Sequence, residues 1–191
     1  MATREQVEEL KQKMAEERTA LIAAARGLTP DDALRVPKDA KGEEQWTALE
    51  QLAHLHEMER SYDAWVRAAL ERDGADLTGV RGEPVRIPIE DANGHSVAEM
   101  LDLLDRERHY TRGLIDGISL EGFDRTAVSP AFGRLTVLQY LRSFYRHDRQ
   151  HAAQIAGRQS DYKPNFASGK EPNQRQARIE LVAKRGQSQQ E

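Results

Sequence analysis

Apolar residues recur at helical spacing in four separate stretches of this chain, at about residues 4–26, 47–72, 96–117 and 136–158. Within each stretch, leucine, isoleucine, valine and methionine return every three or four positions. That spacing places them on one face of an α-helix, with polar residues on the opposite face. The pattern therefore predicts four amphipathic helices.

The starts of three of these helices carry recognisable capping residues. Thr47, Ser96 and Thr136 stand immediately before the apolar periodicity begins. Glu50 and Glu99 follow Thr47 and Ser96 by three positions, which is the spacing of a capping box. These signals predict where the second, third and fourth helices begin.

The segments between the helices are rich in glycine and proline, and two of them are long, at about residues 29–45 and 73–95. Residues 85–89 alternate like a strand, but Pro88 argues against a central strand. No other stretch reads convincingly as a strand. Four helices joined by one or two long connections predict an all-α four-helix bundle with crossover connections.

The length of 191 residues suits one domain with a single core. We expect the bundle to occupy residues 1–158. A polar tail, residues 159–191, follows it, and we expect this tail to be flexible or docked on a partner subunit. Residues 174–184 could form a short helix there.

The charge balance and the composition exclude several classes of protein. With 28 basic and 32 acidic residues, the formal net charge of −4 argues against a nucleic-acid-binding surface. No apolar run approaches the roughly 20 residues needed to cross a membrane, and no secretory signal is evident, so we expect a cytoplasmic protein. Because cysteine is absent, any metal must be held by histidine, aspartate or glutamate.

Two histidines, His147 and His151, stand four residues apart in the fourth predicted helix. They continue its apolar stripe between Phe144 and Ile155, so we expect both imidazoles to point into the bundle. A buried imidazole needs a partner for its nitrogens. The pair could bind one metal ion, or it could form hydrogen bonds with neighbouring core residues.

A third ligand should come from another helix, and the second helix offers two candidates. His54 and His56 lie on opposite flanks of its apolar stripe, so periodicity alone does not choose between them. Glu57, three residues after His54, is a candidate general base or hydrogen-bond partner for a ligand, or simply a solvated carboxylate. We expect His95 and His109 to be surface or capping residues.

Two segments resemble the DinB/YfiT-like family. Residues 46–55 read WTALEQLAHL, similar to the second-helix motif of that family. Residues 135–141 read LTVLQYL and lead to HDRQHAAQI at 147–155, similar to its last core helix. The resemblance implies an up-down-down-up bundle and frequent homodimers. It also selects His54 over His56, and so implies one divalent metal ion on His54, His147 and His151.

Three imidazoles leave at least one coordination position open, as in catalytic sites. The resemblance implies nickel or zinc as the metal, with manganese and iron as further candidates. It implies action on a small-molecule substrate, either transfer of a thiol cosubstrate such as bacillithiol, mycothiol or glutathione, or metal-dependent hydrolysis or isomerisation. The alternative is a non-catalytic protein that keeps the metal for stability or serves as a stress-response binding module.

Overall fold

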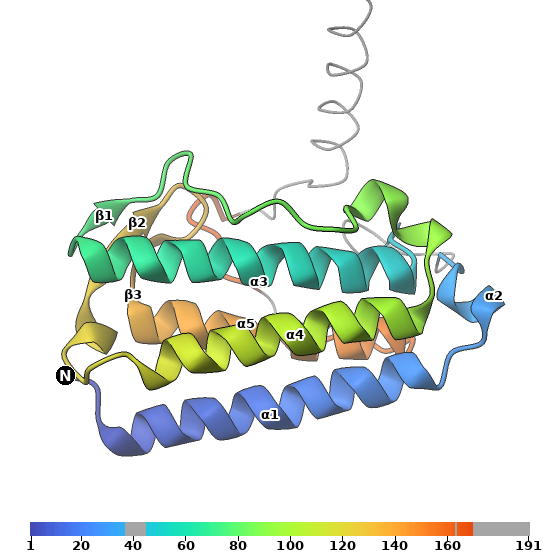
Figure 1. Ribbon diagram of the computed structural model, residues 1–191, viewed down its shortest axis with the longest axis horizontal. Coiled ribbons are helices and arrows are strands. Elements are labelled where there is room, and N and C mark those ends of the chain that lie inside the picture. The colour runs from blue at the N-terminus through green and yellow to red at the C-terminus, as the bar shows by residue number, and fades with distance from the viewer. Residues whose placement is uncertain (37–44, 163, 170–191) are drawn as a thin grey trace, which may run out of the picture.

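Four long helices form the protein, whose computed structural model describes residues 1–36, 45–162 and 164–169. The helices are α1 (Arg4–Arg26), α3 (Ala48–Glu71), α4 (Val97–Asp116) and α5 (Val137–Ile155). Helices α1 and α5 run in one direction and α3 and α4 in the other, as Figure 1 shows. The predicted all-α bundle with up-down-down-up topology is confirmed.

Local capping explains why the helices begin where they do. The hydroxyls of Thr47, Ser96 and Thr136 each accept a hydrogen bond from the backbone N–H three residues on, and each cap is a complete capping box. Thr3 forms the same box at the start of α1. Such a cap contributes about 1 kcal/mol to helix stability.

Helix α5 ends three residues before the predicted boundary at residue 158. Gly157 adopts a left-handed backbone conformation, with φ of 68°. The N–H of Gly157 donates to the carbonyl of Gln154, and the N–H of Arg158 donates to the carbonyl of Ala153. These two bonds form a Schellman motif, which turns the chain out of the helix.

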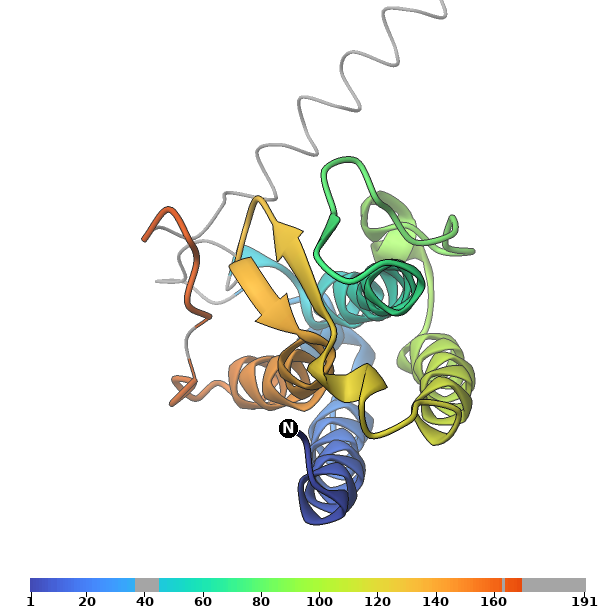
Figure 2. The same cartoon turned by 90° about the vertical axis from the view of Figure 1, so that its left-hand side faces the viewer.

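A small three-stranded sheet, absent from the sequence-based prediction, closes one end of the bundle. Its strands are β1 (Ala75–Asp76), β2 (Thr126–Ser129) and β3 (Gly133–Thr136), in the order β1-β2-β3. Strand β2 pairs with β3 antiparallel and with β1 parallel. Figure 2 shows this sheet across the ends of α3 and α5, where β3 leads directly into α5.

The connection between α3 and α4 returns along the whole bundle, which is why these two helices are parallel (Figure 1). No strand forms at residues 85–89, as Pro88 predicts; Pro88 instead precedes the 3-10 helix η2 (Ile89–Gly94). The connection passes close to α3 at Gly82, where an added Cβ would lie 2.6 Å from the carbonyl carbon of Arg60. Two shorter elements complete the fold, the helix α2 (Pro30–Ala33) and the 3-10 helix η3 (Gly122–Asp124).

The core consists of two apolar clusters with a layer of buried polar side chains between them. One cluster lies toward the sheet and includes Met14, Tyr62, Ile115 and Phe144; the other lies toward the opposite end and includes Leu21, Leu52, Leu104 and Ala152. Between these positions on the four helices stand buried charged residues and histidines: Arg18, His54, Glu59, Arg108, His147, Asp148 and His151. The middle of the bundle is therefore polar.

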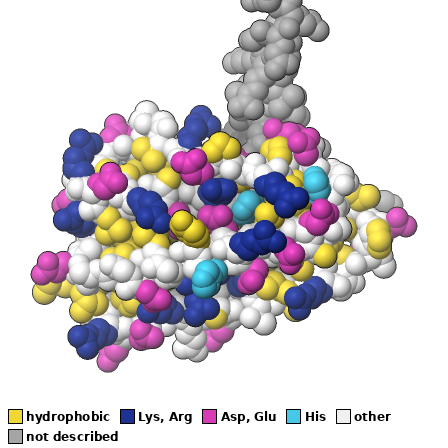
Figure 3. Space-filling view, viewed as in Figure 1, with side chains coloured by type: hydrophobic (Ala, Val, Ile, Leu, Met, Phe, Trp, Pro, Cys, Tyr) yellow, Lys and Arg dark blue, Asp and Glu magenta, His cyan; other side chains and the backbone are white. Residues whose placement is uncertain are grey.

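Acidic and basic side chains lie side by side on the face formed by α1, α3 and α4 (Figure 3). None of the helices in the described ranges combines the length and the apolar character that crossing a lipid bilayer requires.

Candidate metal centre

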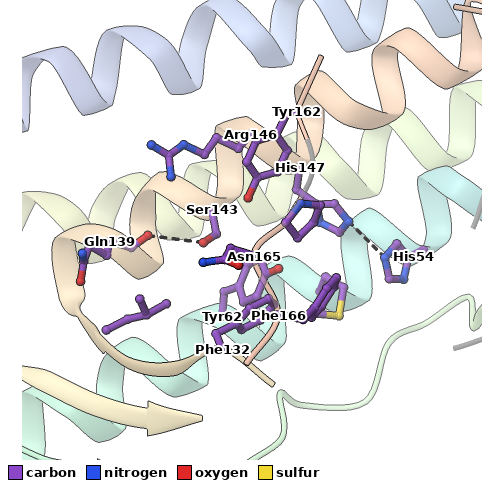
Figure 4. A pocket seen from close by; sticks show the side chains of 13 residues that line it. His54, Tyr62, Phe132, Gln139, Ser143, Arg146, His147, Tyr162, Asn165 and Phe166 are labelled. Carbon is purple, nitrogen blue, oxygen red and sulfur yellow. Dashed lines mark hydrogen bonds between the residues drawn. The ribbon is translucent and has the colours of Figure 1, made fainter. Parts of the chain in front are cut away.

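Three histidine side chains meet in the middle of the bundle. Helix α3 supplies His54, and α5 supplies His147 and His151. Nε2 of His147 lies 3.2 Å from Nε2 of His54 and 3.0 Å from Nε2 of His151. The three potential ligand atoms all lie within 4.8 Å of one another. Figure 4 shows His54 and His147 pointing toward each other from their two helices. The structure thus brings together the three residues proposed from the sequence.

The hydrogen-bonding capacity of His147 argues that this cluster fits a cation. Its Nε2 carries either one hydrogen or one lone pair, yet it faces a ring nitrogen on two sides. A hydrogen bond can therefore satisfy only one of the two contacts. A divalent cation among the three nitrogens would accept a lone pair from each, so the residues present fit a metal ion.

The protonation of the two α5 histidines also suits metal binding. Burial lowers the pKa of His147 to about 4, although the nearby carboxylates of Asp148 and Glu59 act in the opposite direction. Burial lowers the pKa of His151 well below its ordinary value, and the neighbouring His147 adds to this. Both imidazoles are therefore neutral at pH 7, which is the form that donates a lone pair to a metal.

Two residues behind the histidines hold them in place. Gln51 lies one turn before His54 on α3 and is buried; its Oε1 accepts a hydrogen bond from Nδ1 of His151 at 3.0 Å. That bond leaves Nε2 of His151 as the lone-pair nitrogen facing the cluster. The amide of Gln51 donates to the carbonyl of Trp46, whose ring meets that of His54 edge-on. Gln51 was not predicted from the sequence, although its position one turn from His54 is a usable signal.

The remaining histidines lie elsewhere. His56 is buried on the other side of α3, where its Nε2 is 3.5 Å from Oε2 of Glu107 on α4. His95 follows η2 and lies near Glu99, and His109 is exposed on α4. Glu57 is half-buried and is not among the side chains that line the cavity beside the cluster.

A buried layer of four charges adjoins the histidines, with one residue from each long helix. Arg18 pairs with Glu59 at 2.6 Å and with Asp148 at 2.9 Å. Arg108 pairs with the same two carboxylates, at 2.6 and 2.9 Å. Two positive and two negative charges balance, which makes their burial tolerable. Asp148 follows His147 directly, so consecutive residues of α5 belong to the charged layer and to the histidine cluster.

Two acidic groups in and beside this layer have opposite pKa shifts. Burial acts to raise the pKa of Glu59, but the charges and hydrogen bonds of Arg108 and Arg18 outweigh it and lower the pKa to about 2. Asp63, one turn further along α3, accepts a hydrogen bond from Thr111 at 3.0 Å. Burial and the nearby charge of Glu59 raise the pKa of Asp63 to about 7.

A cavity of about 180 Å³ opens beside the cluster. His54 and His147 form one end of it, and the polar side chains of Gln139, Ser143 and Arg146 extend from there along α5 (Figure 4). Its other walls are mainly apolar: Met58, Tyr62, Phe132, Leu135, Pro164 and Phe166, with Tyr162 and Asn165 beside them. An ion on the three histidines would therefore be within reach of a small molecule in this cavity.

The first part of the predicted tail forms one wall of the cavity. The ring of Phe166 stacks on Phe132, with centroids 5.2 Å apart and planes inclined by 23°. The N–H of Ala167 donates to the carbonyl of Ala131 at 2.7 Å. Residues 170–191, which include the predicted helix at 174–184, lie outside the described residues.

These features define an all-α bundle with a histidine cluster at the end of a cavity. The chain belongs to the DinB superfamily, whose sequence profile matches residues 13–155. The family predicted from the two motifs is therefore confirmed. A search of curated proteins finds no match.

Among solved structures, the chain is similar to YfiT from Bacillus subtilis, described as a probable metal-dependent hydrolase with an unusual four-helix bundle topology. The TM-score is 0.65 at 18% sequence identity, and the match covers 82% of this chain and 87% of that chain. At this level of identity the similarity shows a shared fold.

Proposed function

We propose that this protein is a metal-dependent hydrolase that acts on a small molecule, with one divalent metal ion held by His54, His147 and His151. The observation that carries the proposal is the convergence of three histidine ring nitrogens, within 4.8 Å of one another, at the end of a cavity. The description of YfiT as a probable metal-dependent hydrolase supports the same class of reaction.

The protein's own residues have distinct roles in this proposal. A divalent ion held by the three imidazoles would supply Lewis acidity, which polarises a substrate oxygen and lowers the pKa of water. His54 and His147 face the cavity, whereas His151 lies behind them and is oriented by Gln51. Ser143 offers a hydroxyl to orient a substrate, and the apolar walls limit the access of water.

We retain Glu57 as the candidate general base, because it follows His54 by one helical turn. Since it does not line the cavity, it would act through one bridging water molecule. Glu57→Gln keeps the size of the side chain and removes its basicity. We expect a lower kcat with unchanged metal content. An unchanged kcat would show that Glu57 has no part in the reaction.

Metal analysis of the full chain, purified without chelator, tests the ligand set. We expect about one divalent ion per chain, with nickel and zinc the first candidates and manganese and iron next. His147→Ala should abolish binding in a calorimetric titration. His56→Ala and His109→Ala, which remove histidines outside the cluster, should leave binding unchanged. Loss of metal binding with His56→Ala, or its retention with His147→Ala, would contradict the assignment.

A substrate screen tests the reaction class. Nickel-, zinc- and manganese-loaded protein is assayed against simple esters, amides and lactones, with His147→Ala as the inactive control. Thiol transfer, the other activity implied by the family resemblance, needs the same metal, so a second arm contains glutathione and an electrophile. Hydrolysis that depends on His147 supports the proposal. Turnover only with the thiol supports a transferase, and bound metal without turnover supports a metal-stabilised binding protein.

The homodimer stays a prediction from the family resemblance. Analytical ultracentrifugation of the metal-loaded protein tests it: a species of about twice the 21.6 kDa chain mass would support it.

A further inference from the structure

The cavity beside the histidines is positively charged. Among its thirteen described lining residues, Arg146 is the one arginine or lysine, and none is an aspartate or glutamate. A divalent ion on the histidines would add further positive charge. By electrostatics alone, such a cavity favours an anion or a neutral molecule and disfavours a cation.

Arg146 is suited to bind an anion from outside the protein. Its guanidinium carbon lies 5.8 Å from the ring centre of Tyr145 and 5.9 Å from that of Tyr162. No carboxylate in the described part of the chain forms an ion pair with it, whereas Arg149, three residues on, pairs with Asp161. Rings beside the guanidinium restrain its plane. The guanidinium also forms a hydrogen bond with the hydroxyl of Tyr162, and its remaining N–H groups are available to bind two oxygens of a carboxylate.

Figure 4 shows that Arg146 extends along α5 over Ser143, away from His54. The histidines and the guanidinium thus lie toward different parts of the same cavity. A ligand whose anionic group meets Arg146 would place its other end toward the candidate metal centre.

One wall of the cavity is flat and aromatic. Phe132 and Phe166 stack nearly parallel, and Tyr62 packs beside His147 with ring centres 6.2 Å apart. The cavity of about 180 Å³ is slightly larger than a protein cavity of about 150 Å³ that holds benzene. A ring with a short acidic side chain is the size that fits.

Part of this wall comes from residues outside the region that the superfamily shares, so ligand selectivity can differ between its members. Tyr162 and Phe166 follow α5 and lie beyond residues 13–155, the region that matches the superfamily. Removing the Phe166 ring should therefore weaken the binding of flat ligands in the cavity without changing the bundle itself.

We propose that this cavity binds a small aromatic or similarly flat carboxylate, with the carboxylate on Arg146 and the ring against the Phe132–Phe166 wall. The proposal deepens the proposed function by naming its substrate class, and it rests on the same cavity. Arg146 acts as the residue that selects the anion.

The test compares phenylacetate with phenylacetamide, a neutral molecule of nearly the same shape. Both are titrated into the full chain by ligand-observed NMR, once metal-free and once zinc-loaded. We expect phenylacetate to bind at least tenfold more tightly than phenylacetamide in both forms. Arg146→Gln should remove that preference and leave phenylacetamide binding unchanged. Arg146→Lys, which keeps the charge but cannot form a bidentate pair of hydrogen bonds, should give an intermediate affinity for phenylacetate.

Arg142→Gln is the matched control, because it removes a charge one helical turn earlier on α5 from a residue that does not line the cavity. It should behave as the wild type does. Phe166→Ala should weaken both ligands equally. Circular dichroism and zinc stoichiometry, both expected to be unchanged, check that each variant is folded.

Equal binding of the acid and the amide, or a preference that survives Arg146→Gln, overturns the proposal. Phenylacetate binding that appears only in the zinc-loaded protein and survives Arg146→Gln also overturns it, because the metal would then hold the carboxylate. The metal-free titration does not depend on a bound ion. Failure of the hydrolase proposal, seen as absence of metal binding, is thus distinguishable from failure of this one.

Discussion

Replacing Glu59 by glutamine should destabilise the protein strongly while changing its shape very little. The Glu59 carboxylate is 3% exposed and accepts hydrogen bonds from Arg18 and Arg108. A neutral amide would leave two buried guanidinium groups with the single carboxylate of Asp148. The NH₂ group of the glutamine amide would also face an arginine, which has no lone pair to accept a hydrogen bond from it.

Two independent estimates give the size of this effect. Lowering the pKa of Glu59 from 4.5 to about 2 corresponds to roughly 3 kcal/mol in favour of the ionised form, at about 1.36 kcal/mol per pKa unit. Breaking a buried ion pair by removing one partner typically costs about 3–5 kcal/mol. We therefore expect Glu59→Gln to lower the free energy of unfolding at pH 7 by about 3 kcal/mol or more.

Urea denaturation of the wild type and the variant measures this difference, from pH 7 down to the lowest pH at which both still fold. Because the pKa of Glu59 is lower in the folded state, its contribution is fully present above about pH 4.5 and is lost as the pH falls toward 2. The difference between the two proteins should therefore shrink over that interval. Glu71→Gln, at an exposed position of the same helix, should change stability by less than about 0.5 kcal/mol. A loss below 1 kcal/mol, or one that stays constant as the pH falls, would refute the reasoning.

Three further outcomes follow from other contacts. Gln51→Ala removes the acceptor for Nδ1 of His151 and should weaken zinc binding about 10- to 100-fold in a competition titration; unchanged affinity would contradict its orienting role. The pKa of Asp63 is raised to about 7, so the stability of the wild type relative to Asp63→Asn, measured in urea, should fall as the pH rises from about 4 to 7; a difference that stays constant over that interval would contradict the raised pKa. Gly82→Ala forces a Cβ to within 2.6 Å of the Arg60 carbonyl carbon and should lower the melting temperature, whereas Gly79→Ala, in open space, should have a smaller effect that arises from its backbone conformation alone.

The four helices were predictable because their signals are local. Thr47, Ser96 and Thr136 each bind a backbone N–H three residues away, and apolar periodicity needs only the helix itself. The sheet was not predictable in this way, since β1 has two residues and β2 and β3 have four each. Such strands are too short to show a period of two, and pairing between β1 and β2 joins segments about 50 residues apart.

Helical periodicity alone could not predict which of His54 and His56 belongs to the histidine cluster. Both imidazoles are buried, at 2% and 4% exposure, so a test for burial would accept either. His54 faces α5 and its two histidines, whereas His56 faces Glu107 on α4. Only the positions of the neighbouring helices decide which of the two joins the cluster. The family motif supplied that information.

The charged layer and the Phe166 wall escaped sequence reasoning for the same physical reason. Arg18 and Arg108 stand at core positions of their helices, where an isolated charge would be unfavourable. Their carboxylate partners lie 40 to 130 residues away in the chain. No local pattern reveals that these charges compensate one another, or that Phe166 meets Phe132.

The charged layer also fixes the axial position of each helix relative to the other three. Each helix carries one of the four charges, and apolar clusters lie on both sides of them. Sliding any helix by one turn, about 5.4 Å, would bury its charge among hydrocarbon side chains and leave its partners unpaired. Amphipathic stripes alone tolerate such a slip, because leucine packs against leucine at either height. The two arginines and two carboxylates thus set how far along its axis each helix sits, and thereby keep His54 level with His147.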